Sequence, residues 1–322
     1  MSEFALIERY FRRPSDDAAV VLGVGDDAAL ARVAEGHELV LAVDMMVESR
    51  HFLPDVDPSS LGHKILAVNL SDLAAMGATP RWALLAGALP DADPTWLSAF
   101  SQGLFALAQR HGVTLIGGDT TRGPRNVCLT IAGEVPYGQA ILRSGAQAGD
   151  DIWVSGALGE AMLGFAALQG RTSLPAIEFE AARRRLERPE PRNALGVMLR
   201  GIATAMLDVS DGLVGDLGHL VEASNVGATI DVRQVPVSAA LARKIEGEER
   251  ELALACALAG GDDYELCFTA PVERREGVLA VGRESGVRVS RIGHIVDDPK
   301  RVVVRGAHGT IIDVPRSFDH FA

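Results

Sequence analysis

The stretch Asn69-Leu-Ser-Asp-Leu-Ala-Ala-Met-Gly77 decides how this chain is interpreted, because it sets the carboxylate of Asp72 in an apolar run. The pattern from Ile65 to Met76 predicts a helix, and Gly77 can end it in a left-handed conformation at little cost. A carboxylate among apolar residues needs a cation, hydrogen-bond donors or solvent, since burying it unpaired is very costly. Asp72 is therefore a candidate functional residue.

Several other aspartates stand directly after apolar or glycine-containing runs. They are Asp26 and Asp27 after Gly23-Val-Gly25, Asp44 after Leu39 to Val43, Asp119 after Leu115-Ile-Gly-Gly118, and the pair in Asp208-Val-Ser-Asp211-Gly212. Carboxylate oxygens are the ligands that hard divalent cations prefer, and Mg²⁺ commonly binds together with phosphates. The pattern predicts a phosphate site with several Mg²⁺ ions, assembled from scattered aspartates.

Composition limits the classes of partner. The chain has 322 residues, 48% of them hydrophobic and 23% charged, which predicts a globular protein of two domains. The net charge of −12 argues against nucleic acid or an anionic membrane as the main partner. The three cysteines are odd in number and lack metal-ligand spacing, which indicates a reducing compartment. With neither a signal peptide nor a membrane-spanning run in the sequence, we expect a cytoplasmic protein.

Strand and helix candidates are mixed in both halves of the chain without a strict βαβ rhythm, so the predicted fold class is α+β. The turn-rich segment Arg143 to Asp150 marks the expected boundary between a domain at 1–140 and a domain at 149–322. The candidates used below are a helix at Pro94 to His111, a strand at Val113 to Ile116, a helix at Ile177 to Glu187 and a helix at Asn193 to Ala205.

Individual motifs leave alternatives open. Gly117 to Gly123 is either a phosphate-binding turn with Asp119 on a metal or a tight turn with an exposed carboxylate. Gly260 to Glu265 either adds acidic oxygens to the site or forms a charged turn. His51 is a substrate contact or a structural histidine. The run Arg183-Arg-Arg185 favours a solvated helix face over a phosphate site. P-loop and Gly-x-Ser-x-Gly motifs are absent from the sequence, and a Rossmann fingerprint is incomplete.

Taken together and in order, these motifs resemble the bacterial thiamine-monophosphate kinases. The matching segments are Gly23 to Asp27, Val43-Asp44, His51-Phe52, Asn69 to Gly77, Gly117 to Gly123, Asp208 to Gly212, Gly261 to Leu266 and Phe318 to Phe321. The resemblance implies the fold of aminoimidazole ribonucleotide synthetase, and ATP-dependent phosphorylation of thiamine monophosphate to thiamine diphosphate. It also implies a homodimer formed through the sheet of the N-terminal ATP- and Mg²⁺-binding domain, beside a C-terminal α/β domain.

The resemblance carries residue roles with it. It implies Mg²⁺ ligation by Asp27, Asp44, Asp72, Asp119, Asp208 and Asp211, ATP-phosphate binding by Gly118, Asp119, Arg143 and Ser210, and substrate contacts from His51, Asp262 and Phe318. The family often has Thr on both sides of the Asp44 position, where this chain has Val43 and Met45. It also favours Glu at position 262 and an aromatic hydroxyl near position 318.

The acceptor makes a catalytic base unnecessary. A phosphate monoester has a second pKa of about 6, so its oxygen is already anionic at neutral pH. Several Mg²⁺ ions would neutralise the repulsion between acceptor and triphosphate and align a direct in-line transfer. We therefore expect neither a covalent intermediate nor a general-base residue.

Two alternatives to this kinase remain. One is another ATP-using member of the same superfamily. The selenophosphate synthetases need a reactive Cys or selenocysteine near the N-terminus, whereas the first cysteine here is Cys128. A hydrogenase-maturation relative needs a C-terminal cysteine, whereas this chain ends in Ala322. The other is a non-catalytic nucleotide or metal sensor, against which the full set of aspartates argues, because like charges left unused repel each other.

Overall fold

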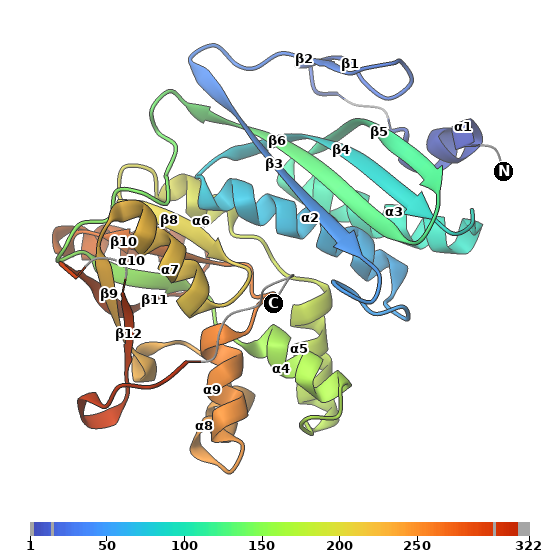
Figure 1. Ribbon diagram of the computed structural model, residues 1–322. Helices are drawn as coiled ribbons and strands as arrows, with labels where there is room; N and C mark the ends of the chain where they lie inside the picture. The colour runs from blue at the N-terminus through green and yellow to red at the C-terminus, as the bar shows by residue number, and fades with distance from the viewer. Residues whose placement is uncertain (1–2, 14–15, 299–300, 315–322) are drawn as a thin grey trace. The chain divides into compact units, whose positions relative to one another are not determined.

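The chain divides into two compact units that each combine helices with a sheet. The computed structural model describes residues 3–13, 16–298 and 301–314. Unit 1 comprises Met1–Leu73 and Ala78–Gly138, and unit 2 comprises Ala74–Gly77 and Gln139–Ala322. The four-stranded and six-stranded sheets, each with helices packed on it, confirm the predicted mixed α+β class (Figure 1). In the described part of the chain, no helix is long and apolar enough to cross a membrane.

Unit 1 is built on a four-stranded sheet of order β3-β6-β4-β5 and a two-stranded sheet, β1-β2. Its elements in chain order are α1 (Glu3–Leu6), the π-helical turn η1 (Ile7–Phe11), β1 (Val20–Leu22), β2 (Leu30–Ala31), β3 (His37–Val47), α2 (Pro58–Ala75), β4 (Thr79–Leu89), α3 (Pro94–His111), β5 (Thr114–Arg122) and β6 (Asn126–Pro136).

One face of the larger sheet is covered by α2 and α3 (Figure 1). The two helices approach each other closely, because a Cβ on Gly103 of α3 would lie 1.8 Å from the carbonyl oxygen of Ser59 in α2. Local signals set the ends of α3. The carboxylate of Asp93 accepts the N–H of Thr95, and Gly112 ends the helix at φ 65°. These contacts explain why this helix was predicted with its observed bounds.

The other face of this sheet exposes apolar side chains along β3. Leu39, Leu41, Val43 and Met45 alternate along the strand and are 46%, 63%, 60% and 56% exposed. On β6, Cys128 pairs with Met45, so its side chain lies on this same face, which we call the open face. The alternate residue Asp44 pairs with the fully buried Leu129, so the carboxylate of Asp44 lies on the helix-covered side.

The strand β5 is longer than the sequence predicts. The expected strand ended at Ile116, whereas the observed strand continues to Arg122 and pairs in parallel with β4, with one register shift at Ile116. Gly117, Gly118 and Asp119 therefore lie within an edge strand rather than in a turn after it. The pairing with β4 supplies hydrogen bonds that override the local tendency of two consecutive glycines to break a strand.

Unit 2 is built on a six-stranded sheet of order β12-β9-β11-β7-β10-β8, in which only the described pair β12-β9 is parallel. Its elements are β7 (Asp151–Ser155), α4 (Glu160–Leu168), α5 (Ala176–Glu187), α6 (Asn193–Met198), β8 (Ala205–Val209), α7 (Leu213–Ser224), β9 (Gly227–Asp231), η2 (Val232–Gln234), α8 (Ala239–Glu246), α9 (Arg250–Ala259), β10 (Glu265–Ala270), η3 (Val272–Arg274), α10 (Arg275–Glu284), β11 (Val289–Val296), β12 (Val302–Arg305) and η4 (Ala307–Gly309).

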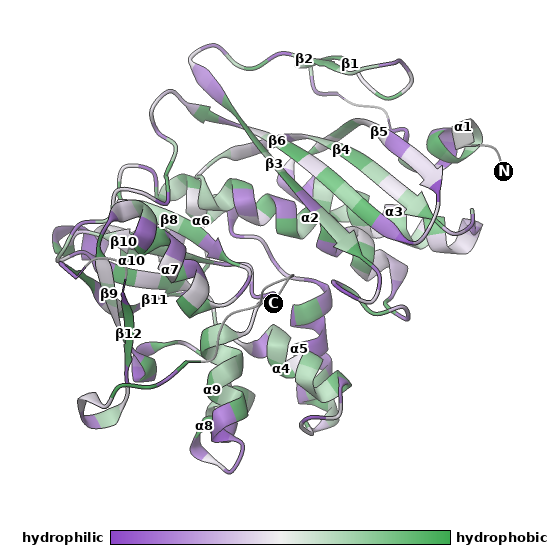
Figure 2. Cartoon of the chain, viewed as in Figure 1, coloured by the Kyte–Doolittle hydropathy of each residue, from purple (hydrophilic) through white to green (hydrophobic). Residues whose placement is uncertain are grey.

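Both faces of the unit 2 sheet are buried. Residues of α4, α7, α8 and α9 pack on one face against side chains such as Val154 and Cys267. Residues of α6 and α10 pack on the other face around Trp153 and Phe268, whose rings stack with centroids 6.5 Å apart. The helices α4 and α9 are coloured mainly as hydrophobic in Figure 2, as expected for helices that are embedded in this core. The helix predicted at Asn193 to Ala205 is shorter than expected and ends at Met198.

The expectation of a solvated arginine face on α5 is wrong for Arg185. Its guanidinium lies 2.8 Å from Glu265, a residue of β10 that is fully buried. Arg192 forms a second ion pair with the same carboxylate, and the hydroxyl of Ser155 donates to it. Arg183, by contrast, pairs with Glu187 along its own helix, as the predicted face requires. Arg185 therefore pairs with the buried carboxylate of Glu265, a residue far away in the sequence, instead of facing solvent.

Candidate active site

In unit 1, two of the predicted metal ligands line one cavity at the β5 edge of the sheet. This cavity has a volume of about 830 Å³, and both Asp27 and Asp119 line it, together with Asp26. All three are exposed. None of the described residues that line this acidic cavity is basic. The nearby guanidinium of Arg12, beside Gly25, is paired with Glu8. The lining carboxylates therefore attract metal ions and repel bare phosphates, so an anionic ligand needs an accompanying cation here.

Gly118 brings the backbone of β5 unusually close to β4. Its φ is +147°, and a Cβ at this position would lie 1.8 Å from the carbonyl oxygen of Leu85. Side chains other than hydrogen are therefore excluded on steric grounds. The glycine fixes the path of the strand immediately before Asp119, and so fixes where that carboxylate enters the cavity.

The other acidic residues predicted in unit 1 lie outside the lining of this cavity. Asp44 lies on β3 and Asp72 near the end of α2; both side chains are half-buried, and neither is among the described residues that line the cavity. The structure thus brings Asp27 and Asp119 together. It places Asp44 and Asp72 on the elements that the sequence predicts for them.

His51 follows β3 in a turn that orients its ring. The Nδ1 atom of His51 accepts a hydrogen bond from the backbone N–H of Val47 at 3.0 Å. An accepting Nδ1 places the proton of the neutral imidazole on Nε2. The half-buried ring therefore carries its N–H on Nε2.

In unit 2, the predicted residues Asp208, Ser210 and Asp211 occupy the end of β8 and the loop to α7. Asp208 is 7% exposed, whereas Ser210 and Asp211 are half-buried. The loop carbonyl of Ser210 accepts the N–H of Asp262 at 2.8 Å, so two segments predicted to carry function lie side by side. The structure brings together four of the predicted site residues here.

Asp216, which the sequence reasoning missed, holds this loop in place. Its Oδ2 accepts the backbone N–H groups of Ser210, Asp211 and Gly212, each at 3.0 Å. Burial raises the pKa of Asp216 to about 7, although the hydrogen bond from the N–H of Asp211 acts in the opposite direction. An acidic residue in the first turn of a helix after a Ser-Asp-Gly loop is a capping signal, and it could have identified Asp216.

The acidic residues of the segment from Gly260 to Glu265 are of two kinds, structural residues and a candidate site residue. Asp263 is buried and accepts the N–H of Gly159 at 2.8 Å, and Glu265 pairs with arginines, so both have structural partners. Asp262 is half-buried at φ 67°, and Tyr264 at φ 50° donates its hydroxyl to the carboxylate of Asp262 at 3.0 Å. Two non-glycine residues with positive φ in three positions are strained, a feature that clusters at functional sites.

The remaining predicted residues are Arg143 and Phe318. Arg143 lies on an exposed turn, where its carbonyl oxygen accepts a hydrogen bond from the hydroxyl of Ser224. Phe318 lies outside the described residues.

The acidic cavity fits Mg²⁺ in the chemistry of its donors. No group of three or more His, Cys, Asp or Glu side chains within residues 3–13, 16–298 and 301–314 is gathered as a metal site. Mg²⁺ usually keeps several waters and binds through one or two carboxylates plus substrate phosphates, so a dedicated cage is not needed. Asp27 and Asp119 offer that number of hard oxygen ligands around a space large enough for a phosphate.

Comparison with known proteins identifies the family. The family model of AIR synthase related protein, N-terminal domain, matches residues 25–135, and that of the C-terminal domain matches residues 147–305. The thiamine-monophosphate kinase of Escherichia coli is 47% identical over 99% of this chain and 98% of its own length. That of Bacillus subtilis is 34% identical over the full length of both chains.

Solved structures agree with these relatives. The crystal structure of thiamine-monophosphate kinase from Stenotrophomonas maltophilia has a TM-score of 0.87 at 45% identity, and the match covers 97% of this chain and 98% of that one. A structure of AaThiL complexed with AMPPCP and TMP has a TM-score of 0.78 at 28% identity, over 90% of this chain and 89% of that one. On this evidence, the chain belongs to the thiamine-monophosphate kinase family.

Proposed function

We propose that this protein transfers the γ-phosphoryl group of ATP to thiamine monophosphate and so forms thiamine diphosphate. Full-length relatives carry this name at up to 47% identity, and a related structure was solved with AMPPCP and TMP. The observation on this chain that carries the proposal is the acidic cavity, which Asp27 and Asp119 both line although they are far apart in the sequence.

The chain's own residues have to bind and orient two anions. Bound Mg²⁺ ions would supply the positive charge that allows a triphosphate and a phosphate monoester to approach each other. Asp27, Asp44, Asp72 and Asp119 in unit 1, and Asp208 and Asp211 in unit 2, are the residues we propose as Mg²⁺ ligands. Gly118, Asp119, Arg143 and Ser210 are proposed to hold the phosphates of ATP.

Substrate contacts are proposed for His51, Asp262 and Phe318. The Nε2–H of His51 suits a phosphate oxygen, and the carboxylate of Asp262, held by the hydroxyl of Tyr264, suits the cationic ring system of thiamine. No side chain has to accept a proton, because the acceptor oxygen is already ionised at neutral pH. We therefore propose direct in-line transfer without a phosphoenzyme.

Association and location complete the proposal. We propose a homodimer that buries the open face of the unit 1 sheet, because four alternating apolar side chains are 46% to 63% exposed there. We propose that the domain at 1–140 binds ATP and Mg²⁺ and forms the dimer, and that residues 149–322 form a second, α/β domain. The three free cysteines agree with a reducing, cytoplasmic setting.

The test is formation of thiamine diphosphate from ATP and thiamine monophosphate with Mg²⁺, followed by chromatography. We expect product from the wild type, and Asp119→Asn and Asp211→Asn to lose at least about 100-fold in turnover, since metal ligation contributes several kcal/mol. Asp297→Asn, which removes an exposed carboxylate of unit 2, is the matched control and should keep wild-type turnover.

The same assay separates the alternatives. ATP consumption without thiamine diphosphate would assign the chain to another acceptor within the superfamily, and ATP binding without turnover would make it a sensor. A labelled phosphoprotein, trapped by acid quench during turnover with γ-labelled ATP, would refute direct transfer.

A further inference from the structure

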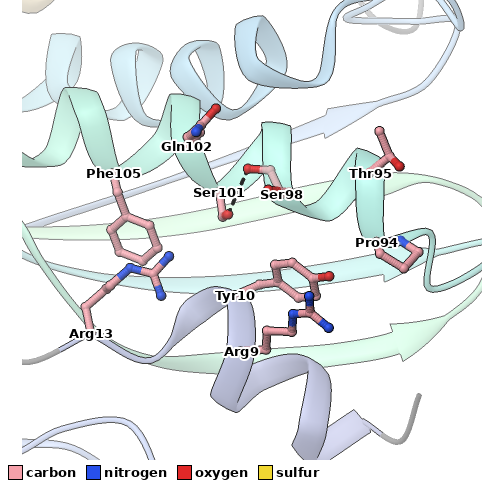
Figure 3. A pocket seen from close by; sticks show the side chains of 9 residues that line it. All are labelled: Arg9, Tyr10, Arg13, Pro94, Thr95, Ser98, Ser101, Gln102 and Phe105. Atoms are coloured by element: carbon pink, nitrogen blue, oxygen red, sulfur yellow. Dashed lines mark hydrogen bonds between the residues drawn. The ribbon is translucent and has the colours of Figure 1, made fainter.

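Unit 1 has a second cavity, which lies between η1 and α3 and shares none of the described lining residues of the acidic cavity (Figure 3). Its volume is about 510 Å³, which is within the range of small-molecule sites. Arg9, Tyr10 and Arg13 line it on one side, and side chains of α3 line it on the other. We call this cavity the arginine groove.

The charge of the arginine groove is opposite to that of the acidic cavity. Neither Arg9 nor Arg13 forms an ion pair with a carboxylate in the described part of the chain, in a protein whose net charge is −12. The nearby acids have other partners: Glu8 pairs with Arg12 at 2.8 Å, and Asp93 accepts the N–H of Thr95. The groove is therefore a local positive site on an acidic molecule.

Aromatic rings hold both guanidinium groups at the groove. The guanidinium of Arg9 lies 5.4 Å from the ring centroid of Tyr10, and that of Arg13 lies 4.6 Å from the centroid of Phe105. Stacking uses the face of a guanidinium and leaves its N–H edge available. Arg13 donates one of its N–H groups to the carbonyl oxygen of Arg12 at 2.9 Å.

The groove also contains hydroxyl groups. Tyr10 is only 5% exposed, and its hydroxyl has no hydrogen-bond partner among the described residues. In Figure 3 this hydroxyl points along α3 toward Pro94 at the start of that helix. Ser101 donates to the carbonyl oxygen of Ser98 at 3.1 Å, and Ser98 itself lines the groove. A buried donor without an acceptor is costly, so the hydroxyl of Tyr10 has most to gain from an anionic oxygen.

We propose that the arginine groove binds a small phosphate-bearing molecule at a site separate from the one that holds the reacting phosphates. Guanidinium groups match phosphate oxygens in geometry, and the hydroxyls of Tyr10 and Ser98 add neutral donors. Because the positive charge comes from side chains, this site needs no metal ion. The acidic cavity, by contrast, needs a cation before it can accept a phosphate.

This difference provides the test. Inorganic pyrophosphate is titrated into the full-length protein by calorimetry in the presence of EDTA, so that the metal-dependent site cannot bind it. The wild type is expected to show saturable binding at one site per chain. The double variant Arg9→Gln/Arg13→Gln should weaken binding at least about tenfold, the loss expected for charge-assisted hydrogen bonds. Arg283→Gln, an exposed arginine on α10, is the control and should bind as the wild type does.

A milder variant keeps the proposal testable if the double variant folds poorly. Tyr10→Phe removes only the unpartnered hydroxyl, and it should weaken pyrophosphate binding several-fold without lowering the melting temperature. Absence of saturable binding by the wild type in EDTA would overturn the proposal. Equal binding by Arg283→Gln and a folded Arg9→Gln/Arg13→Gln variant would overturn it as well.

Discussion

Gly118 is the residue at which backbone geometry constrains the candidate site most tightly. Its positive φ and its approach to Leu85 leave no room for a side chain. The nearby Gly123 belongs to the same motif, yet a Cβ there would meet only the Cβ of Ala88 at an ordinary 3.5 Å. Two glycines that look equivalent in the sequence are therefore under different steric demands.

This difference leads to a prediction for paired alanine variants. Gly118→Ala has to push β5 away from β4 and displace Asp119 by about 1 Å, which costs about 100-fold in turnover when a reacting group is misplaced. Gly123→Ala should remain within a few-fold of the wild type. Steady-state rates of thiamine diphosphate formation, with circular dichroism to verify folding, would measure both. Equal losses from the two variants would contradict the steric explanation.

Among the elements, those whose ends are encoded locally were predictable from the sequence. The helix α3 has its cap at Asp93, its proline at Pro94 and its terminating glycine at Gly112, and the predicted bounds match. The strand β5 was predicted too short, because its continuation depends on pairing with β4, a contact that local sequence does not encode. The partner of Arg185 was missed for the same reason, since Glu265 reaches it only through folding.

The loop between α9 and β10 carries a titratable group with a predictable effect on stability. Burial holds the pKa of Asp263 well above its usual range, although the N–H of Gly159 opposes this. An unfolded Asp has a pKa of about 3.9, so above that pH the folded state retains a proton that the unfolded state has lost. The free energy of unfolding therefore falls as pH rises from about 4 through the folded pKa.

Asp263→Asn isolates this effect, since the amide oxygen can still accept the N–H of Gly159 but does not titrate. The variant should lose less stability than the wild type over that pH range, with a difference in slope of up to about 1.4 kcal/mol per pH unit. Urea unfolding in EDTA between pH 4.5 and 8 would measure this. Parallel curves for the two proteins would show that Asp263 is ionised in the folded state.

For the whole molecule, the sequence was more informative about chemistry than about assembly. Aspartates after apolar runs predicted a metal–phosphate site, and their role as metal ligands stays a prediction. That Asp27 and Asp119 share a cavity, and that Asp216 holds the loop at Ser210, depends on contacts between distant segments. Those contacts become visible only in the folded structure.

The open face of unit 1 leads to a prediction about association. Val43→Lys introduces a charge into the centre of the apolar stripe on β3, and a two-fold dimer through this face brings two such charges into the interface. The proposed dimer should weaken by at least about 100-fold, because like charges placed together in an interface cost several kcal/mol. Analytical ultracentrifugation would measure this. Ile177→Lys, at an 85% exposed apolar position on α5, is the control and should leave association unchanged.

The three cysteines of this chain differ in how readily their thiols react. Burial raises the pKa of Cys256 to about 11 and that of Cys267 still further, so both thiols resist alkylation. Cys128 is half-buried on the open face, and although its pKa is also raised, it is the most accessible of the three. Because the proposed homodimer would cover that face, the rate at which a thiol reagent reacts with Cys128 in the wild-type chain would report on association through the sheet, without any engineered cysteine.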